Sequence, residues 1–398
     1  MNSISEMIEE IKRLSNEYFQ EILEIRRYLH KHPELSFNEF QTSKYIKHTL
    51  SNWGIEFSEG FAKTGIIVTL SGSVKTEKVI ALRADFDALP IKEENDVEYK
   101  SINEGVMHAC GHDAHTASML GALKILNNLK SKWSGTIKFI FQPAEEMLPG
   151  GAKQMIEEGV LLSPNVTEML AQHVLPELES GKVGFKEGKY MASTDEIYIN
   201  IIGAGGHAAI PKNYNNPILS ASDLILILNK NFLKKNHNNS IFAIGYVSAK
   251  GSTNVIPDNV NLKGTFRALT ESHRDIAHQE MKDIVKILEK KYDVQIDLDI
   301  RKGYPALFND EKVTQKNVLN AKKYLGEENV VELPIRMTAE DFSYFANEVP
   351  SCFYRIGVGN PRAKHNYGLH TSKFNIEEDS LKIGMGLMAY QALWQLKD

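Results

Sequence analysis

The sequence predicts an α/β fold of two domains. The larger domain has a mixed, mostly parallel sheet flanked by helices, and a smaller domain is inserted into it. The first observation is length, because 398 residues exceed what a single hydrophobic core usually organises. The second is the alternation of expected strands and helices along the first half of the chain, which is typical of parallel sheets. The third is a change of this order after about Gly188, which marks the insertion.

The first half of the chain carries a regular succession of apolar patterns. Over the first 30 residues apolar side chains recur every three or four positions, which predicts a long helix. Asp113 stands where it would cap a later helix. The further elements expected here are helices at 38–51, 113–129 and 151–158, and strands at 66–70, 79–84, 136–141 and 169–171.

After Gly188 the expected order becomes strand, helix, strand, strand, helix, strand, which is the ferredoxin-like arrangement. Such a unit is self-contained, so we place an inserted domain at 189–303, between the two parts of the larger domain at 1–188 and 304–398. Its strands are expected at 195–202, 241–248, 260–269 and 294–300, and its helices at 216–231 and 271–290. The last part of the chain is expected to form a helix at 313–325, a strand at 352–356 and a closing helix at 376–396.

The composition limits the partners and the location that we expect. The net charge is −5 and the basic residues are scattered, so no nucleic-acid partner is expected. No apolar run approaches the roughly 20 residues of a membrane span, so no membrane partner is expected either. With only Cys110 and Cys352, a disulfide framework is not expected. The acidic start of the chain lacks a secretory pattern, and we expect a cytoplasmic protein.

The segment 108–115 holds one thiol, three imidazoles and one carboxylate within eight residues. Cys110 and His112 stand two positions apart, so on a turn they can converge on one centre, and both are good ligands for zinc, manganese or nickel. Cys110 as a catalytic nucleophile activated by a histidine is an alternative. A structural zinc site is a weaker one, because no second closely spaced Cys/His pair completes it.

Further metal-binding and acid/base groups follow the other expected strands. Asp85 and Asp87 come after the strand at 79–84, Glu145 and Glu146 after the strand at 136–141, and His173 after the short strand. Taken alone, each has an ordinary alternative: a loop cap, solvated surface carboxylates, or a core histidine. Parallel strands, however, bring such ends to one edge of the sheet. Together with the Cys/His turn they suit a two-metal site with a shared ligand.

Several segments together resemble the metal-dependent aminoacylase and carboxypeptidase family, most closely its branch of hippurate hydrolases, auxin–amino-acid conjugate hydrolases and N-acetyl-diaminopimelate deacetylases. The resemblance implies two divalent metal ions per subunit, and thiolate, imidazole and carboxylate ligands suit zinc, manganese, nickel or cobalt. It also implies that Glu145 is the general base. The matching segments are 29–36, 83–90, 108–115, 141–146, 203–211 and 254–257, with His370. The implied ligands are Cys110 as the bridge, and His112, Glu146, His173 and His370 as the remaining ligands.

The chain departs from the peptidase branch of that family at two positions. That branch carries His-x-Asp where this chain has Asp85-Phe86-Asp87, and it carries a bridging Asp instead of a Cys. The imidazole is then expected from His112, and Asp87 is expected to support a ligand without binding the metal itself. Both departures match the amidohydrolase branch and weaken the case for a peptidase.

The inserted domain carries its own candidates. The resemblance implies that His207 stabilises the oxyanion, often in the partner subunit of a dimer, and that Asn254 and Arg267 hold polar groups of the substrate. Arg267 suits a free carboxylate, which it can grip with two hydrogen bonds, although a solvated charge at a strand edge is the alternative. The glycines at 203–206 superficially resemble a dinucleotide fingerprint, but their spacing is wrong.

The function expected from these observations is that of a metal-dependent amidohydrolase. It would cleave N-acyl amino acids or related small amides to a carboxylate and an amine, and form a homodimer through the inserted domain, which also serves as a lid. The alternatives are a dipeptidase, aminopeptidase or carboxypeptidase on the same scaffold, and a catalytically inactive binding protein.

Overall fold

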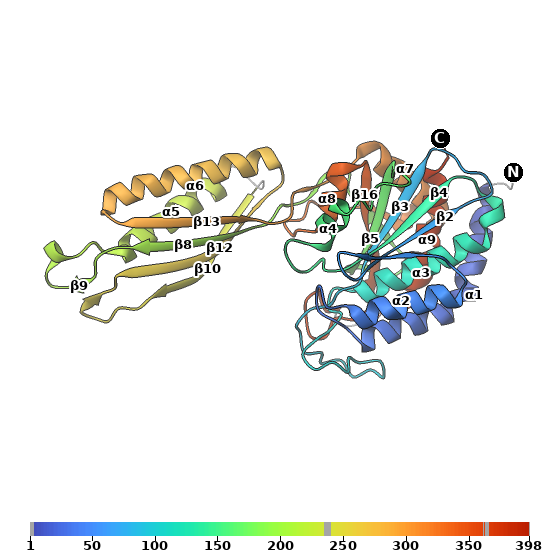
Figure 1. Cartoon of the computed structure of the whole chain (residues 1–398), viewed down its shortest axis with the longest axis horizontal. Coiled ribbons are helices and arrows are strands. Elements are labelled where there is room, and N and C mark those ends of the chain that lie inside the picture. Colours follow the sequence, from blue (N-terminus) through green and yellow to red (C-terminus); the bar gives the residue numbers. More distant parts are fainter. Residues whose placement is uncertain (1–3, 235–239, 361, 363–365, 398) are drawn as a thin grey trace. The chain divides into compact units, whose positions relative to one another are not determined.

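The computed structural model describes residues 4–234, 240–360, 362 and 366–397 (Figure 1). The chain divides into two compact units. The first consists of residues 1–188, 308–334 and 344–398, and the second of residues 189–307 and 335–343. The short piece 335–343 of the second unit was not singled out from the sequence. Three elements span the points where the chain passes from one unit to the other: β7 (Gly188–Met191), β14 (Leu307–Asn309) and α8 (Phe342–Glu348).

The first unit is a mixed α/β fold built on an eight-stranded sheet. Its four central strands, β4, β3, β5 and β16, run parallel, and β2 and β6 pair with them in antiparallel fashion on the two sides. The strands are, in spatial order, β1 (Ser58–Phe61), β2 (Gly65–Ser71), β4 (Thr136–Gln142), β3 (Val79–Asp85), β5 (Glu168–Glu179), β16 (Ser351–Gly359), β6 (Val183–Phe185) and β15 (Val330–Glu332). The parallel centre brings the carboxyl ends of β3 and β4 level with the part of β5 that follows Ala171, where His173 lies.

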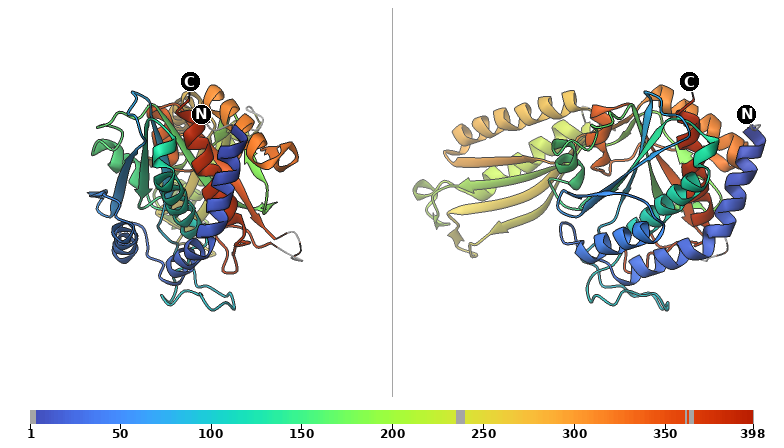
Figure 2. Two further views of the ribbon diagram at one scale, coloured as in Figure 1. Left: turned by 90° about the vertical axis from the view of Figure 1, so that its right-hand side faces the viewer. Right: turned by 45° about the vertical axis from the view of Figure 1, so that its right-hand side comes forward.

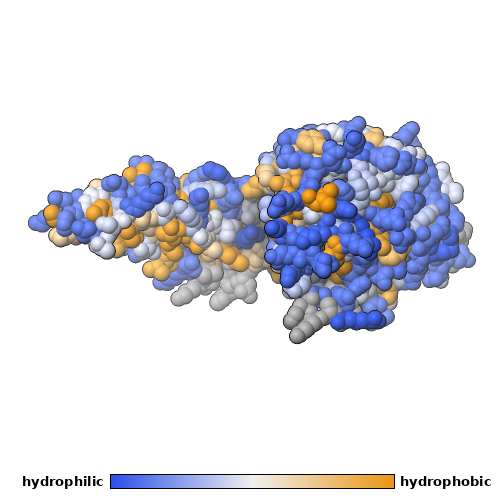
Figure 3. Space-filling model, turned by 90° about the horizontal axis from the view of Figure 1, so that it is seen from below, coloured by the Kyte–Doolittle hydropathy of each residue, from blue (hydrophilic) through white to orange (hydrophobic). Residues whose placement is uncertain are grey.

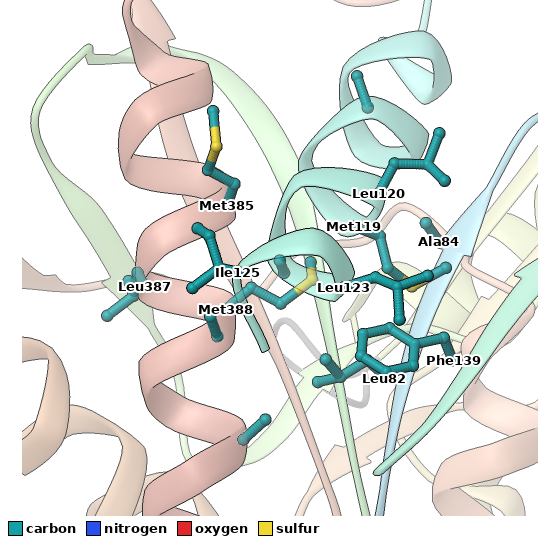
Figure 4. Packing of buried hydrophobic residues seen from close by; sticks show 14 of the residues in the cluster. Leu82, Ala84, Met119, Leu120, Leu123, Ile125, Phe139, Met385, Leu387 and Met388 are labelled. Atoms are coloured by element: carbon teal, nitrogen blue, oxygen red, sulfur yellow. The ribbon is translucent and has the colours of Figure 1, made fainter. Parts of the chain in front are cut away.

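Helices α3 and α9 pack side by side on the central strands, and α1 lies across both (Figure 2). The core between them is apolar and closely packed, with side chains from β3, β4, α3 and α9 interleaved (Figure 4). Gly121 allows this approach, because a Cβ there would lie 2.8 Å from the Met385 Cβ. The helices are α1 (Ile4–Lys31), α2 (Phe40–Asn52), α3 (His112–Asn128), α4 (Gly151–Glu157), α7 (Glu311–Leu325) and α9 (Ser380–Gln395), with 3₁₀ turns at Lys130–Lys132 and Glu327–Asn329. Among the described residues, none of the helices combines the length and apolar character that a membrane span needs.

The expected elements of this unit are present, with three differences. The prediction that Asp113 caps α3 is wrong: the N-cap is Gly111, and the Asp113 carboxylate instead binds Arg26 and His30. The strand expected at 169–171 extends over twelve residues, because β5 is paired with β3 and then with β16 along its length. The closing helix begins at Ser380 and not near 376.

The second unit is a four-stranded antiparallel sheet in the order β10-β12-β8-β13, with two helices. Alternate residues of β8 are buried, as expected for a sheet that helices cover on one face. Gly203 and Gly205 are required by close backbone packing, because a Cβ would lie 2.2 Å from the Asn215 carbonyl and 2.6 Å from the Ile256 carbonyl. The elements are β8 (Asp195–Ile202), β9 (Gly206–His207), a 3₁₀ turn (Pro211–Asn213), α5 (Pro217–Lys234), β10 (Ser240–Ala249), β11 (Val255–Ile256), β12 (Asn259–Ala268), α6 (Glu271–Tyr292) and β13 (Gln295–Lys302).

Candidate metal centre

The turn Cys110-Gly111-His112 places a thiol and an imidazole at the start of α3. Gly111 adopts φ +83°, a left-handed conformation that glycine takes without steric cost. A Cβ at this position would lie 2.5 Å from the Val174 Cγ2 of β5, so the turn packs directly on that strand. This close approach brings Cys110 to His173 of β5, with 3.4 Å between the Cys110 Sγ and the His173 Nε2.

Two groups of potential metal ligands meet at Cys110. Cys110, His112 and His173 form the first, and Cys110, Glu146 and His370 form the second. Within each group the ligand atoms lie within 4.8 Å of one another. The structure therefore brings together all five residues that the resemblance implied as ligands, with the thiol common to both groups. This arrangement suits two cations that share one ligand.

Glu145 lies beside these groups. Its carboxylate belongs to a further set with His112 and Glu146, again with all ligand atoms within 4.8 Å of one another. The side chain is buried, with 6% of the residue exposed. A carboxylate at this place is within reach of a water between the two ligand groups, as a general base must be.

Hydrogen bonds orient two of the three candidate imidazoles, those of His173 and His112, so that one nitrogen of each faces the cluster. His173 Nδ1 lies 2.8 Å from the carbonyl oxygen of Val174; a carbonyl only accepts, so Nδ1 carries the proton and Nε2 is left for a metal. His112 Nδ1 donates to the Asp87 Oδ1 at 3.1 Å, which leaves Nε2 toward Glu146. Asp87 therefore orients His112, one of the candidate ligands.

Two atoms of the cluster show that a cation fits. His112 Nε2 is buried and has no hydrogen-bond partner among the described residues; Glu146 Oε1 is also buried and lies 3.2 Å from the Nε2 of His370, another candidate ligand. Burial lowers the pKa of His112, but the carboxylates of Asp85 and Asp87 outweigh it and raise the pKa to about 10. The protein surroundings thus favour a positive charge at this imidazole. A divalent metal ion held by His112 would supply that charge in place of a proton.

The thiol of Cys110 does not have the surroundings of a catalytic nucleophile. Burial, and then the carboxylates of Glu146 and Glu145, raise its pKa well above the ordinary value. Nucleophilic cysteines have lowered pKa values instead. A bound cation is what makes a thiolate favourable at such a site, which supports the role of a ligand.

Asp85 does not belong to the ligand groups around Cys110. Its Oδ2 accepts a hydrogen bond from Arg83 at 2.6 Å, and its Oδ1 accepts one from His115 Nδ1 at 2.6 Å. His115 Nε2 accepts in turn from the backbone N–H of Val174 at 2.9 Å. The carbonyl of the same Val174 binds His173. Asp85 and His115 therefore hold the strand segment that carries His173, a candidate metal ligand, a role that the sequence did not indicate.

Replacing His115 by phenylalanine should lower the midpoint of thermal unfolding by several degrees. The change keeps a ring in the core but leaves the Val174 N–H and one Asp85 oxygen without their partner, at about 1–3 kcal/mol for each buried group. Differential scanning calorimetry of the metal-loaded protein measures it. The matched control is His48→Phe on the exposed face of α2. Equal midpoints for the two variants would contradict the role given to His115.

The inserted unit carries three expected site residues, of which the structure brings two together. Strand β9 pairs with β11 so that His207 lies opposite Val255, and the Ala208 N–H donates to the Asn254 carbonyl at 3.0 Å. His207 Nδ1 accepts from the Ala209 N–H at 3.1 Å, so its proton is on Nε2, where it can be donated to a substrate. Arg267 lies elsewhere in the unit, on β12, with its Nη1 donating to the Met337 carbonyl at 3.2 Å.

Comparisons with known proteins agree with this chemistry. A family model described as peptidase family M20/M25/M40 matches residues 81–393. The N-acetyl-L-cysteine deacetylase of Bacillus subtilis is 33% identical over 95% of this chain and 89% of its own. Thermostable carboxypeptidase 2 of Saccharolobus solfataricus is 36% identical over 95% of this chain and 96% of its own.

A solved structure of the same family is also similar to this chain. A Bacillus subtilis protein, described as a dinuclear metal binding peptidase from the M20 family, matches with a TM-score of 0.83 at 32% identity. The match covers 96% of this chain and 99% of that one. Deacetylases and carboxypeptidases are therefore both among the similar proteins.

Proposed function

Since the chain belongs to peptidase family M20/M25/M40 and is a metal-dependent hydrolase acting on amides, we propose that it cleaves N-acyl amino acids or related small amides. The products are a carboxylate and an amine. The observation that carries the proposal is the pair of ligand groups that meet at Cys110. A sulfur ligand at this centre is sensitive to oxidation, which favours a reducing compartment such as the cytoplasm.

In this proposal the first unit, made mainly of residues 1–188 and 304–398, is the catalytic domain. Two divalent ions, of zinc, manganese, nickel or cobalt, would polarise the amide carbonyl and lower the pKa of the attacking water. Glu145 accepts a proton from that water and passes it to the departing amine. The residues that would hold these ions are Cys110, which belongs to both ligand groups, His112 and His173 of the first group, and Glu146 and His370 of the second.

The inserted unit, mainly residues 189–303, is proposed as a ferredoxin-like lid that also forms a homodimer. His207 comes shortly after Ile202, the last residue of β8, and Asn254 comes shortly before Asn259, which pairs with Ile202. Arg267 follows Phe266, which pairs with Asp195 at the other end of β8. Seven steps along β8 are roughly 23 Å at about 3.3 Å per residue, and β9 lies at one end of this sheet (Figure 1). An N-acyl amino acid is shorter than that, so the two ends do not both reach one substrate within one subunit. If a second copy of the chain supplies His207 and Asn254, these residues and Arg267 of the first copy can contact the same substrate.

The surface of the inserted unit supports self-association. Figure 3 shows apolar side chains among polar ones on this unit. On α5, Leu219 and Leu226 are 54% and 68% exposed. Tyr246 and Val247 are exposed on β10, which is an edge strand of its sheet. An exposed apolar helix face beside an open strand edge is a typical place for a second copy to bind.

The substrate assignment is tested by comparing N-acetyl and N-benzoyl amino acids with dipeptides that have a free amine. Each is supplied with several added metals, and amine release is followed. We expect kcat/KM to be higher for the N-acyl substrates by at least tenfold, because Cys110 and Asp85 depart from the peptidase pattern. Faster cleavage of free-amine dipeptides would favour the alternative of a dipeptidase or aminopeptidase. Blocked peptides with a free carboxylate test the carboxypeptidase alternative, which Arg267 also suits.

A further inference from the structure

Glu39 is a buried carboxylate that the proposed reaction does not use. It immediately precedes α2 and is 0% exposed. Its Oε1 accepts hydrogen bonds from the backbone N–H groups of Phe37 and Ala144, both at 2.9 Å, and its Oε2 accepts from the Thr64 hydroxyl at 3.0 Å. Burial, together with the negative charge of Asp87, raises the pKa of Glu39 to about 7. Burying a carboxylate costs free energy, so the presence of Glu39 here, with three hydrogen-bond partners, needs an explanation.

The three partners lie in segments whose backbone is strained. Phe37 has φ +63° and Ala144 has φ +53°, and the two residues before Thr64, Ala62 and Lys63, have φ +42° and +75°. Residues with a Cβ adopt this left-handed conformation at a cost of about 1–2 kcal/mol each. One side chain therefore ties together three chain segments that each contain residues in this costly conformation.

The bond to Ala144 has the most direct consequence for the site. Ala144 immediately precedes Glu145 and Glu146, so the orientation of its peptide sets where these two side chains point. Behind them the Glu146 N–H donates to the Asp87 Oδ2 at 2.9 Å. Two buried carboxylates, Glu39 before and Asp87 after, thus hold the loop at alternate amides.

We propose that Glu39 is a positioning residue that fixes the backbone at 143–146, and with it the directions of Glu145 and Glu146. The inference rests on the proposed function, in which these two residues are the base and a metal ligand. The positioning role requires the length of the Glu39 side chain and an oxygen that accepts hydrogen bonds. The role does not require a negative charge on Glu39.

Two substitutions separate reach from charge. E39Q keeps an oxygen at the place that accepts from Phe37 and Ala144, and the Thr64 hydroxyl can accept from the new amide. E39D keeps the charge but is one methylene too short. We expect kcat of the metal-loaded E39Q enzyme to stay within about threefold of wild type. A misplaced reacting group can cost about 10²-fold, so we expect E39D to lose 10- to 100-fold in kcat with little change in KM. After dialysis, E39Q should retain nearly as much metal per chain as wild type, and E39D should retain less.

The matched control is Glu34→Ala. Glu34 belongs to the same segment, but its carboxylate binds the N–H and hydroxyl of Thr42 in α2 and not the loop. We expect its kcat to remain at the wild-type value. Equal kcat and retained metal for E39D and E39Q, or an equal loss in Glu34→Ala, would overturn the inference. E145Q is measured alongside: if it stays active, the role of Glu145 as the base fails and this inference loses its premise, whereas an inactive E145Q beside a fully active E39D rejects Glu39 alone.

Discussion

Replacing Glu145 by glutamine is expected to lower kcat for N-acyl amino acid hydrolysis by about 10²–10⁴-fold, the usual contribution of a general base. Glutamine has nearly the same shape and fills the same buried position after β4, but its amide does not take up a proton. KM should change little, because Glu145 is not assigned to substrate binding. Steady-state kinetics on the best N-acyl substrate measure both constants.

The control for this variant is its metal content. The two ligand groups that meet at Cys110 do not include Glu145, so E145Q should retain the same metal per chain as wild type. Wild-type kcat in a fully loaded E145Q would contradict the role of the base. Full activity of the wild-type protein after metal removal would instead favour the alternative of Cys110 as a nucleophile.

The placement of the site was largely predictable, because it depends on parallel strands. Asp87, Glu146 and His173 follow or lie in β3, β4 and β5, and the paired strands bring them to one edge. The turn at Cys110 could be expected from its local sequence, since glycine permits the left-handed conformation found there. The local sequence pattern and the sheet topology were enough to predict where these residues lie, because the strands and the turn that carry them set their positions.

The residues that support the site were not predictable in the same way. Asp113 was expected to cap its own helix, but it binds His30, which lies 83 positions earlier in the chain. Glu39 reaches Ala144 across 105 positions. The start of α9 was misplaced for a similar reason: Glu378, within the region expected to be helical, lies before the helix and binds Arg26 and Arg27 of α1. Hydrogen bonds between distant segments leave no periodic pattern in a sequence, and only the folded chain reveals them.

Replacing His207 by alanine is expected to lower kcat by about 10²–10³-fold, as removal of one oxyanion donor does in other hydrolases. The Nε2–H that the Ala209 contact leaves free is the donor that would be lost. The thermal midpoint should not change, because His207 is exposed. An unchanged kcat in His207→Ala would contradict its role, whatever the oligomeric state.

The same variant decides which subunit the histidine serves. In a mixed dimer of His207→Ala and E145Q chains, one subunit keeps Glu145 and its partner keeps His207. If His207 acts across the interface, one of the two sites in each mixed dimer is complete, and random mixing of the two inactive proteins should restore about one quarter of wild-type activity. If it acts within its own subunit, every site in the mixture lacks one group and no activity returns. If both residues contact one substrate, the separation of His207 from Arg267 along β8 favours the first result, because a second copy would supply the other end of the inserted unit.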